Sequence, residues 1–462
     1  MSDILTSSQA ELTRSSRKQA LETLVRLALP AIVQQMLSSI LQYVDTAMVG
    51  HLGAAATASV STSTSVNWLV HSLPGGFAIG LLSLLSQAYG RGDRDEMKRL
   101  SALGCRLVLF FGVVITVICL AVSPFLPAWM QADPEIRPAA SAYFFIVSVP
   151  LLFFVSNSIF ASCMHAVKDT RTPMIVNLSA NVLNVALNYL FIYKLSLGTN
   201  GAAYATAVST AAGGIGMFIA YRSKKELRVE LRDVLVHEKL LLEKVMRVAL
   251  PVTGTTIVSC LGYIVFSGMV NGMGVTVFAA HAIAVTAEEI FYLPGYGIRT
   301  ATSALIGIAI GERDQQKFQN IRFVSLALTA VLMMLSGIAL FFCAYPLMRF
   351  FTADETVARM GADVLKIVAF SEPFFGLMVA WQGISYGTGR TRSVFVIEAF
   401  SMWCVRILCT RLVIRAGCGL NAVWYCMVAD NVTKAVALTV YGLTHPYSVN
   451  AAGKAEAVEV AE

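Results

Sequence analysis

Long apolar segments alternate with short polar ones along the whole chain, and this pattern constrains the fold more than any other feature. A helix of about 20 residues, rising about 1.5 Å per residue, crosses a hydrocarbon core of roughly 30 Å. Twelve segments meet that length, near residues 24–49, 57–89, 100–123, 138–164, 173–193, 201–221, 245–271, 276–310, 323–345, 361–388, 394–415 and 421–442. Only 14% of the 462 residues are charged, whereas soluble chains carry about 25%. We therefore expect an all-α integral membrane protein with twelve transmembrane helices.

The first 23 residues are polar and of mixed charge. They lack the short apolar core and the small-residue cleavage site of a removable signal peptide. We expect the first helix to act as a retained insertion signal. Residues 1–23 and 443–462 are then predicted to be cytoplasmic ends.

The distribution of basic residues predicts the orientation. With both termini cytoplasmic, the cytoplasmic segments hold 24 Lys and Arg residues, and the outer loops and their edges hold five: Arg137, Lys194, Arg349, Arg359 and Arg415. This is the positive-inside asymmetry of multi-pass proteins. The net charge of +7 is then explained by the orientation of the chain in the membrane, and no nucleic-acid partner is expected. The predicted location is the inner (plasma) membrane.

Nine cysteines lie at 105, 119, 163, 260, 343, 404, 409, 418 and 426, with no CxxC spacing. We interpret them as small hydrophobic residues and expect neither a disulfide framework nor a zinc site. No cofactor is predicted.

Matching motifs recur at a constant offset of 221 residues. Pro30 in LALP corresponds to Pro251 in VALP, and Gly53 corresponds to Gly274. GRGD at 90–93 corresponds to GERD at 311–314, Thr170–Arg171 to Thr391–Arg392, and Asn200 to Asn421. Each match alone is weak, but five in one register indicate a duplication.

Six helices fit in each repeat, so both halves enter the membrane from the same side and form a parallel repeat. The predicted domains are an N-lobe (24–221), a cytoplasmic linker (222–244) and a C-lobe (245–442). Leu227, Leu231, Val234 and Leu235 suggest a short amphipathic helix in the linker. Two like lobes around a central cleft are typical of transporters, and a helical bundle without a cavity is the alternative.

Two membrane segments carry polar stripes at helical spacing. Gln34, Ser38, Gln42 and Asp45 follow steps of 4, 4 and 3 residues, and Asn177, Asn181, Asn184 and Asn188 follow steps of 4, 3 and 4. Exposing these groups to lipid would cost free energy. The stripes favour a hydrated cavity, and hydrogen bonding between helices is the alternative.

Asp45 is the only carboxylate that we place inside the membrane in the first half. The second half embeds Glu288, Glu289, Glu372, Glu398 and Asp430 against Arg299, Lys366, Arg406, Arg411 and Lys434. Asp430 and Lys434 are spaced for a structural ion pair. Embedding Asp45 costs roughly 2.5–3.5 kcal/mol on insertion scales, so we expect a proton or a metal ion to bind it. A static hydrogen bond from a protonated aspartate is the alternative.

At these residues the chain resembles the multidrug and toxic-compound extrusion (MATE) family of antiporters. The resemblance rests on VDTAMVGHLG (44–53), SQAYGRGD (86–93), KDTRTPM (168–174), LNYLFIY (187–193), GAAYATAVS (201–209), AAHAIAVTAEEIFYLPGYG (279–297) and WCVRI (403–407). It covers residues 24 to 442 and implies two six-helix lobes forming a V around a cleft. It also implies export of drugs or metabolites driven by an inward Na⁺ or H⁺ gradient.

The resemblance implies a coupling-ion site at Asp45, Asn184, Asn188 and Thr206. Many members have aspartate at the position of Asn188, so this site has one carboxylate where those members have two, and Na⁺ or H⁺ fits better than a divalent ion. Some members have a glutamate near Ser259, which is absent here. Glu288 matches a glutamate of many bacterial members and shares a helix face with Tyr292 and Arg299, so a role in transport and a pair with Arg299 both stay open. The further cavity candidates are Gln34, Gln42, Trp68, Asn177, Asn181 and Tyr292.

The sequence does not predict an enzyme, because the six histidines are scattered and no nucleophile lies beside a base. No GxxxxGK[ST] motif supports ATP-driven transport. A dedicated metabolite exporter, a lipid-linked oligosaccharide flippase of the same superfamily and a channel remain alternatives. The expected partners are the lipid bilayer and a small amphipathic or cationic substrate, and the expected state is a monomer.

Overall fold

In the computed structural model, residues 2–236 and 238–449 are described, and all regular secondary structure within these ranges is helical. The chain forms two compact units, which we describe separately. The N-unit is Val33–Thr253, and the C-unit comprises the chain up to Ile32 and from Gly254 onward.

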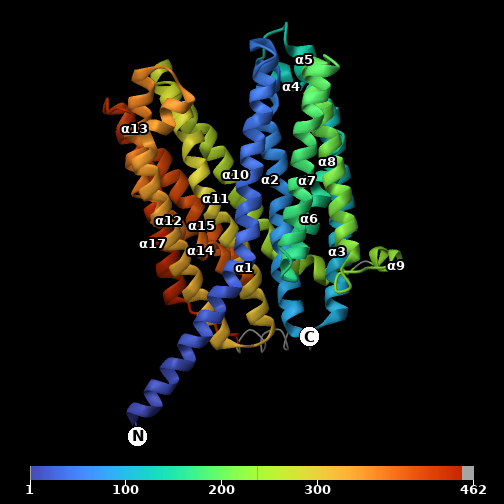
Figure 1. Ribbon diagram of the computed structural model, residues 1–462, viewed down its shortest axis with the longest axis vertical. Coiled ribbons are helices and arrows are strands. Elements are labelled where there is room, and N and C mark those ends of the chain that lie inside the picture. The colour runs from blue at the N-terminus through green and yellow to red at the C-terminus, as the bar shows by residue number, and fades with distance from the viewer. Residues whose placement is uncertain (1, 237, 450–462) are drawn as a thin grey trace. The chain divides into compact units, whose positions relative to one another are not determined.

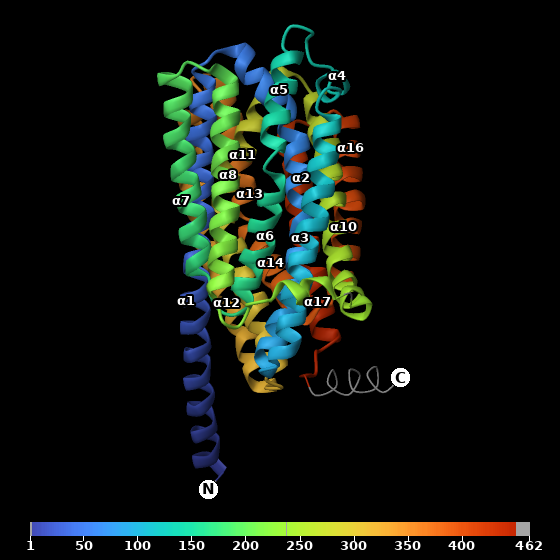
Figure 2. The ribbon, with the colours of Figure 1, turned by 90° about the vertical axis from the view of Figure 1, so that its right-hand side faces the viewer.

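The N-unit contains the later part of the first helix and the first part of the tenth. Its elements are α1 (Ser2–Gly50), α2 (Ala54–Arg91), α3 (Arg94–Val122), α4 (Leu126–Trp129), α5 (Arg137–Ser148), α6 (Leu151–Ala166), α7 (Arg171–Asn188), the π-helical turn η1 (Tyr189–Lys194), α8 (Gly198–Ser223), α9 (Leu231–Leu235) and α10 (Lys239–Asn271). Helix α6 packs against α2, α3 and α8, and α7 packs against α8 (Figures 1 and 2).

The C-unit contains the first part of α1 and the remainder of α10. Its other elements are α11 (Val275–Gly311), α12 (Gln315–Phe351), α13 (Glu355–Ala369), α14 (Glu372–Thr388), α15 (Thr391–Phe400), the π-helical turn η2 (Ser401–Ile407), α16 (Leu408–Arg415) and α17 (Leu420–Thr444). Helix α11 packs against α12 and α14, and α14 packs against α17 (Figure 1).

Within the described ranges, nine helices are long and apolar enough to cross a membrane, and the bent pairs α5–α6 and α13–α14 add two more. Helix α17 is outside that set, but it is 25 residues long and follows the last of these spans. The predicted all-α membrane fold is confirmed, and each of the twelve predicted segments falls on one of these helices or helix pairs.

Four local features differ from the simple helical expectation. The α5–α6 pair bends by 44° and the α13–α14 pair by 54°, where Pro150 and Pro373 disfavour a continuous helix. Helix α1 begins at Ser2, so it extends through the predicted polar N-terminal segment. The predicted linker helix is short, since α9 has five residues and Leu227 lies before it.

The compact units divide inside two helices rather than in a loop. Helix α1 belongs to the C-unit through Ile32, and α10 belongs to the N-unit through Thr253. Each division comes two residues after a proline inside the helix, Pro30 in α1 and Pro251 in α10. A proline removes one hydrogen bond of the helical ladder, so both divisions lie where the helix is weakened.

Backbone geometry repeats at the same 221-residue offset as the sequence motifs. Four pairs of residues have a positive φ in both halves: Gly53 and Gly274, Gly92 and Arg313, Lys168 and Gly389, and Ser196 and Gly417. Each pair occupies the same turn of the duplicated topology. The halves therefore share their turn conformations even where glycine has been replaced by a residue with a side chain.

The turn after α2 and the turn after α11 carry the same ion pair with reversed charges. Arg91 pairs with Glu96 in the first half. At the equivalent positions Glu312 pairs with Lys317, with Nζ and Oε2 2.5 Å apart. Asp93 and Asp314 cap the following helices by accepting backbone hydrogen bonds of 2.9 Å from Glu96 and Lys317. The pairing has been kept although each partner has changed sign.

Small residues allow the helices to approach closely. A Cβ atom on Gly214 of α8 would lie 2.3 Å from the carbonyl oxygen of Phe153 on α6. A Cβ atom on Gly387 of α14 would lie 2.5 Å from the carbonyl oxygen of Ser303 on α11. Such contacts are typical of membrane helices, whose association depends on close packing.

Candidate functional site

The two predicted polar stripes meet in the N-unit. Asn181 Nδ2 on α7 donates a 2.9 Å hydrogen bond to Ser38 Oγ on α1. Asn188 Nδ2, seven residues further along α7, donates to Asp45 Oδ1, seven residues further along α1. Both bonds join residues separated by 143 positions. The two helices therefore run parallel, and their polar faces match over two turns.

Asn188 is the central residue of the group. Its side chain is fully buried, and its Nδ2 also lies 3.3 Å from Asn184 Oδ1. Asn184 Nδ2 in turn lies 3.4 Å from Thr206 Oγ1 and 3.3 Å from Ser209 Oγ on α8. The carboxylate, two amides and two hydroxyls form one connected set, which includes all four predicted coupling-ion residues. Ser209 was not predicted, although it lies one helical turn after Thr206.

One acceptor of this group has no partner. Asn188 Oδ1 is buried and receives no hydrogen bond from any residue that the structure describes. A buried acceptor without a donor is costly. Asn188 can therefore gain a contact if its amide turns and presents Oδ1 to a cation or to a protonated carboxyl group.

The surroundings of Asp45 are apolar on one side. Val49, Tyr143, Ile192, Ala202 and Ala203 form a buried cluster at this end of the N-unit. Asp45 itself is half-buried, and its partner in the described structure is the Asn188 amide rather than a basic side chain. The carboxylate is thus held by a neutral donor next to a low-polarity wall.

The remaining N-unit candidates have different environments. Asn177 Oδ1 accepts a 2.7 Å hydrogen bond from Asn157 Nδ2 on α6. Gln34 is half-buried and its Oε1 has no hydrogen-bond partner. Gln42 and Trp68 are exposed, Trp68 by 50%. The structure brings Asp45, Asn184, Asn188 and Thr206 together and places these four residues outside that group.

No cluster of three or more His, Cys, Asp or Glu side chains that could hold a metal ion occurs among the described residues. The Asp45 group instead offers oxygens of one carboxylate, two amides and two hydroxyls. Oxygen atoms suit hard cations, and a single carboxylate matches a monovalent charge.

In the C-unit, Glu288 and Arg299 have separate partners. Tyr292 donates its hydroxyl hydrogen to Glu288, and its ring stacks on Phe375 with centroids 4.0 Å apart. Arg299 Nη1 donates a 2.9 Å hydrogen bond to Gln382 Oε1. Glu288 is 2% exposed. The Glu288–Arg299 pair that the sequence left open is absent from these contacts.

Asp430 binds two cations rather than one. Lys434 Nζ lies 2.9 Å and Arg406 Nη2 lies 2.8 Å from the same Oδ2 atom. Ser401 Oγ donates a 2.6 Å hydrogen bond to Oδ1. The structure contains the expected Asp430–Lys434 ion pair and adds Arg406 to it, so equal numbers of acids and bases do not imply separate pairs.

Glu372 was counted among the embedded acids, but its environment differs from that of the others. It begins α14 directly after the bend and is fully buried, and neither carboxyl oxygen has a hydrogen-bond partner within residues 2–236 and 238–449. A buried polar group without a hydrogen-bond partner is destabilising. The proline that follows it, Pro373, was the available signal, but the sequence interpretation treated 361–388 as one continuous segment and counted Glu372 among five acids and five bases.

Comparisons with known proteins agree with one another. The MatE family model matches residues 30–190 and 251–411, two segments that differ by the 221-residue offset. A Thermotoga maritima protein named "Probable multidrug resistance protein NorM" is 27% identical over 414 residues, covering 88% of this chain and 89% of that protein. The Proteus mirabilis "Multidrug resistance protein MdtK" is 22% identical over 390 residues, covering 83% and 85%.

Two solved structures have the same fold. One, titled "Outward-facing conformation of a multidrug resistance MATE family transporter of the MOP superfamily", has a TM-score of 0.87 at 21% identity and covers 94% of this chain and 97% of that one. The other is described as a MOP superfamily transporter from Pyrococcus furiosus, with a TM-score of 0.87 at 21% identity, covering 93% and 97%.

Proposed function

This chain belongs to the MatE family, and from that premise we propose that it is a secondary active efflux transporter for drugs, organic cations or related small molecules. Family membership makes it a multi-pass membrane transporter and not an enzyme. The names of its relatives, NorM and MdtK multidrug resistance proteins, support the substrate class. The energy source in this proposal is an inward gradient of Na⁺ or H⁺.

The hydrogen-bonded group around Asp45 supports the coupling mechanism. With Asp45 ionised, the Asn188 amide donates to it and Asn188 Oδ1 is left without a donor. When Na⁺ or a proton neutralises Asp45, the amide turns and Oδ1 faces the ion or the carboxyl hydrogen. Neutralised Asp45 no longer attracts a cationic substrate, so ion binding and substrate binding oppose each other, as antiport requires.

In this proposal, the rearrangement at Asp45 is transmitted by bending of helix α1. Asp45 lies four turns after Pro30, inside the same helix, and a proline within a helix is a site of bending. Two solved structures that share this fold are titled MATE "in the straight conformation" and "in the bent conformation". We infer that α1 bends near Pro30 when the contacts of Asp45 rearrange, which alternates access to the substrate.

Contacts within the C-unit support an even number of membrane crossings. Asn320 Nδ2 donates a 2.8 Å hydrogen bond to Ser16 Oγ, and the backbone amide of Val449 donates one of 2.8 Å to Gln315 Oε1. Gln315 and Asn320 lie in the first two turns of α12. Residues 16 and 449 are therefore close to the same end of that helix, and the basic loops make that end cytoplasmic in the proposal.

Gradient-driven efflux from proteoliposomes tests the function. A fluorescent organic cation should leave vesicles that contain the protein when an inward Na⁺ or H⁺ gradient is imposed, and an ionophore that collapses the gradient should stop it. Asp45→Asn should reduce export to the level of protein-free vesicles while the protein remains folded. Export by Asp45→Asn at the wild-type rate would exclude the coupling role.

Cysteine labelling tests the topology. In a cysteine-free background, Lys225→Cys should be shielded from an impermeant thiol reagent in intact cells, and Asp133→Cys should react. Labelling of residue 225 from outside would reverse the proposed orientation.

Two alternatives exist for the transported substrate. One structural neighbour has a title that reads "Reverse polarity of binding pocket suggests different function", which is the reason for keeping these alternatives. A dedicated metabolite exporter or a flippase for lipid-linked oligosaccharides would transport no organic cation in the vesicle assay.

A further inference from the structure

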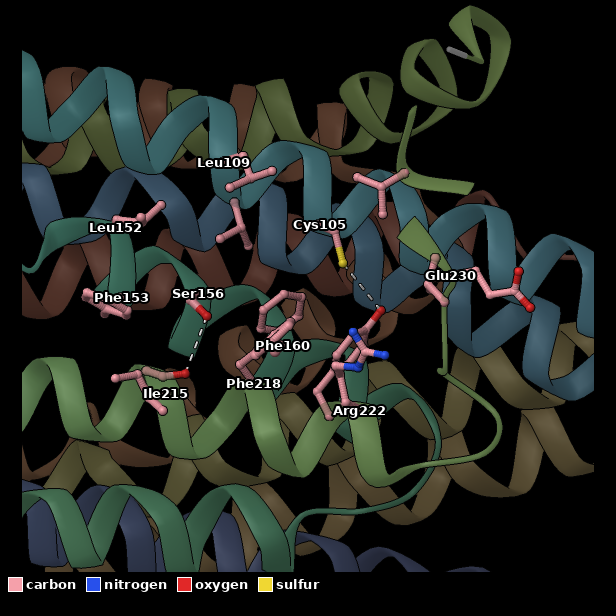
Figure 3. A pocket seen from close by; sticks show the side chains of 15 residues that line it. Cys105, Leu109, Leu152, Phe153, Ser156, Phe160, Ile215, Phe218, Arg222 and Glu230 are labelled. Atoms are coloured by element: carbon pink, nitrogen blue, oxygen red, sulfur yellow. Dashed lines mark hydrogen bonds between the residues drawn. The ribbon is translucent and has the colours of Figure 1, made fainter. Parts of the chain in front are cut away.

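A cavity of about 260 Å³ lies in the N-unit between α3, α6, α8 and the linker that leads to α9 (Figure 3). It shares no residue with the group around Asp45. Apolar side chains form most of its wall, among them Val108, Leu152, Phe160 and Phe218. If each non-hydrogen atom of a ligand occupies roughly 30 Å³, as a water molecule does, the cavity holds about nine such atoms.

One wall of the cavity is accessible from outside the protein. Leu109 on α3 is 54% exposed, and Ile215 on α8 is 46% exposed. Both helices are apolar enough to cross a membrane. The cavity therefore opens sideways toward the hydrocarbon region rather than only toward water.

The cavity has one polar end. Figure 3 shows Arg222 and Glu230 at one end and Leu152 and Phe153 at the other. The Glu230 carboxylate is compensated, because Arg232 Nε lies 2.9 Å from it. The Arg222 guanidinium instead lies over the ring of Phe218, 6.0 Å from its centroid, and forms no ion pair within the described part of the chain. A cation at the mouth of an apolar slot is complementary to an amphipathic anion.

The adjoining linker adds positive charge. Residues 222–247 contain eight Lys and Arg residues and five Asp and Glu residues. Clusters of basic residues beside a membrane helix attract anionic lipid headgroups.

We propose that this cavity binds one acyl chain of an anionic phospholipid whose phosphate contacts Arg222. The apolar slot holds the first part of the chain, its open side lets the rest continue into the bilayer, and Arg222 selects the negative headgroup. A free phosphate would leave the apolar wall unfilled. The site depends on the cavity and its charge. The proposed topology, in which the linker is cytoplasmic, would place the lipid in the cytoplasmic leaflet.

Native mass spectrometry of the full-length protein tests the site. The protein is extracted from vesicles of equal parts phosphatidylglycerol and phosphatidylcholine, and the retained lipids are counted. The wild type should retain phosphatidylglycerol preferentially. Arg222→Gln should lower that retention about fivefold, the ratio expected for one basic residue near an anionic surface. The matched control is Arg228→Gln, which removes the same charge from the linker outside the cavity and should retain lipid like the wild type.

A second variant tests the apolar slot. Ser156 lines the cavity and donates a 3.5 Å hydrogen bond to the carbonyl oxygen of Gly214. Ser156→Leu extends an apolar side chain into the slot and should reduce retention although Arg222 is present. Equal retention by the wild type and Arg222→Gln, equal retention of both lipids, or displacement by free glycerol phosphate would each overturn the proposal. Retention is measured without transport, so failure of the efflux assay leaves this result unaffected.

Discussion

The side-chain amide of Asn188 donates a hydrogen bond to the Asp45 carboxylate, although the two residues are 143 positions apart in the chain. This bond connects the carboxylate to Asn184, Thr206 and Ser209. Any ion that binds Asp45 must compete with the amide or make it turn. The ionic state of α1 is therefore linked to side chains of α7 and α8.

Replacing Asn188 with leucine should stop gradient-driven efflux while leaving a folded protein. The substitution removes the amide that responds to the charge of Asp45 and offers no oxygen to an ion. Efflux from proteoliposomes, with the folded yield measured by size-exclusion chromatography, checks this. Asn181→Leu is the matched control, because it removes the equivalent bond to Ser38 two turns away and should retain partial coupling. Equal loss in both variants would indicate that these bonds only hold α1 and α7 together.

Asn188→Asp should have the opposite effect on ion binding. A second carboxylate beside Asp45 should lower the ion concentration at which efflux is half-maximal, because the site then carries an additional negative charge. An unchanged ion dependence would show that residue 188 does not face the ion.

Asp430→Asn should act on stability rather than on coupling. It removes the carboxylate that binds both Lys434 and Arg406 and leaves two buried cations, which should cost about 3–5 kcal/mol. Thermal unfolding in detergent and membrane yield measure the loss. Asp363→Asn, at an exposed carboxylate on α13, is the control and should be close to neutral. Normal stability of Asp430→Asn would contradict the structural role.

Asp169, in the turn between α6 and α7, should make the stability of the protein depend on pH. Burial acts to raise its pKa, but the Lys224 ammonium at 2.5 Å and hydrogen bonds from Thr172 outweigh burial and hold the pKa below its usual 3.8. A lowered pKa in the folded state means that the stabilisation is present above about pH 4 and is lost as the pH falls through the folded-state value. Because Lys224 is partly exposed, the effect should be roughly 1 kcal/mol or less.

The test compares the melting temperatures of the wild type and Asp169→Asn. The wild type should be more stable at pH 7, and the difference should shrink as the pH falls below 4. Asp133→Asn, in an exposed loop, should show no such trend. A difference that grows on acidification would refute the assignment.

The sequence predicted the helices and the polar faces because both depend on local spacing. Apolar runs of sufficient length become membrane helices, and the seven-residue steps from Ser38 to Asp45 and from Asn181 to Asn188 place these residues on one face of each helix. The constant offset of 221 residues predicted the duplication for the same reason, because matching motifs mark equivalent turns of the two halves. It could not predict which face meets which, because that depends on how α1 packs against α7.

The ion pairs of the C-unit could not be predicted by counting acidic and basic residues. Equal numbers of acids and bases do not show which side chains lie close enough to pair. Asp430 binds both Arg406 and Lys434, Glu398 accepts a 2.5 Å hydrogen bond from Gln382, and Glu372 is left without a partner. The bends near Pro150 and Pro373 could not be predicted either, because both prolines lie within long apolar segments. Whether a proline there bends the helix depends on how the neighbouring helices pack.

The reversed ion pairs at the two equivalent turns bear on how a duplicated chain avoids assembling wrongly. Two halves whose equivalent turns have the same backbone conformation could exchange hairpins during insertion, with α2 pairing with α12 or α11 with α3. Such an exchange would place Arg91 against Lys317, or Glu312 against Glu96, so that like charges meet. Correct pairing brings opposite charges together in both halves. The reversal of charge therefore favours pairing of helices from the same half over pairing of helices from different halves. If both turns carried the same ion pair, correct and exchanged hairpins would have equally favourable charges.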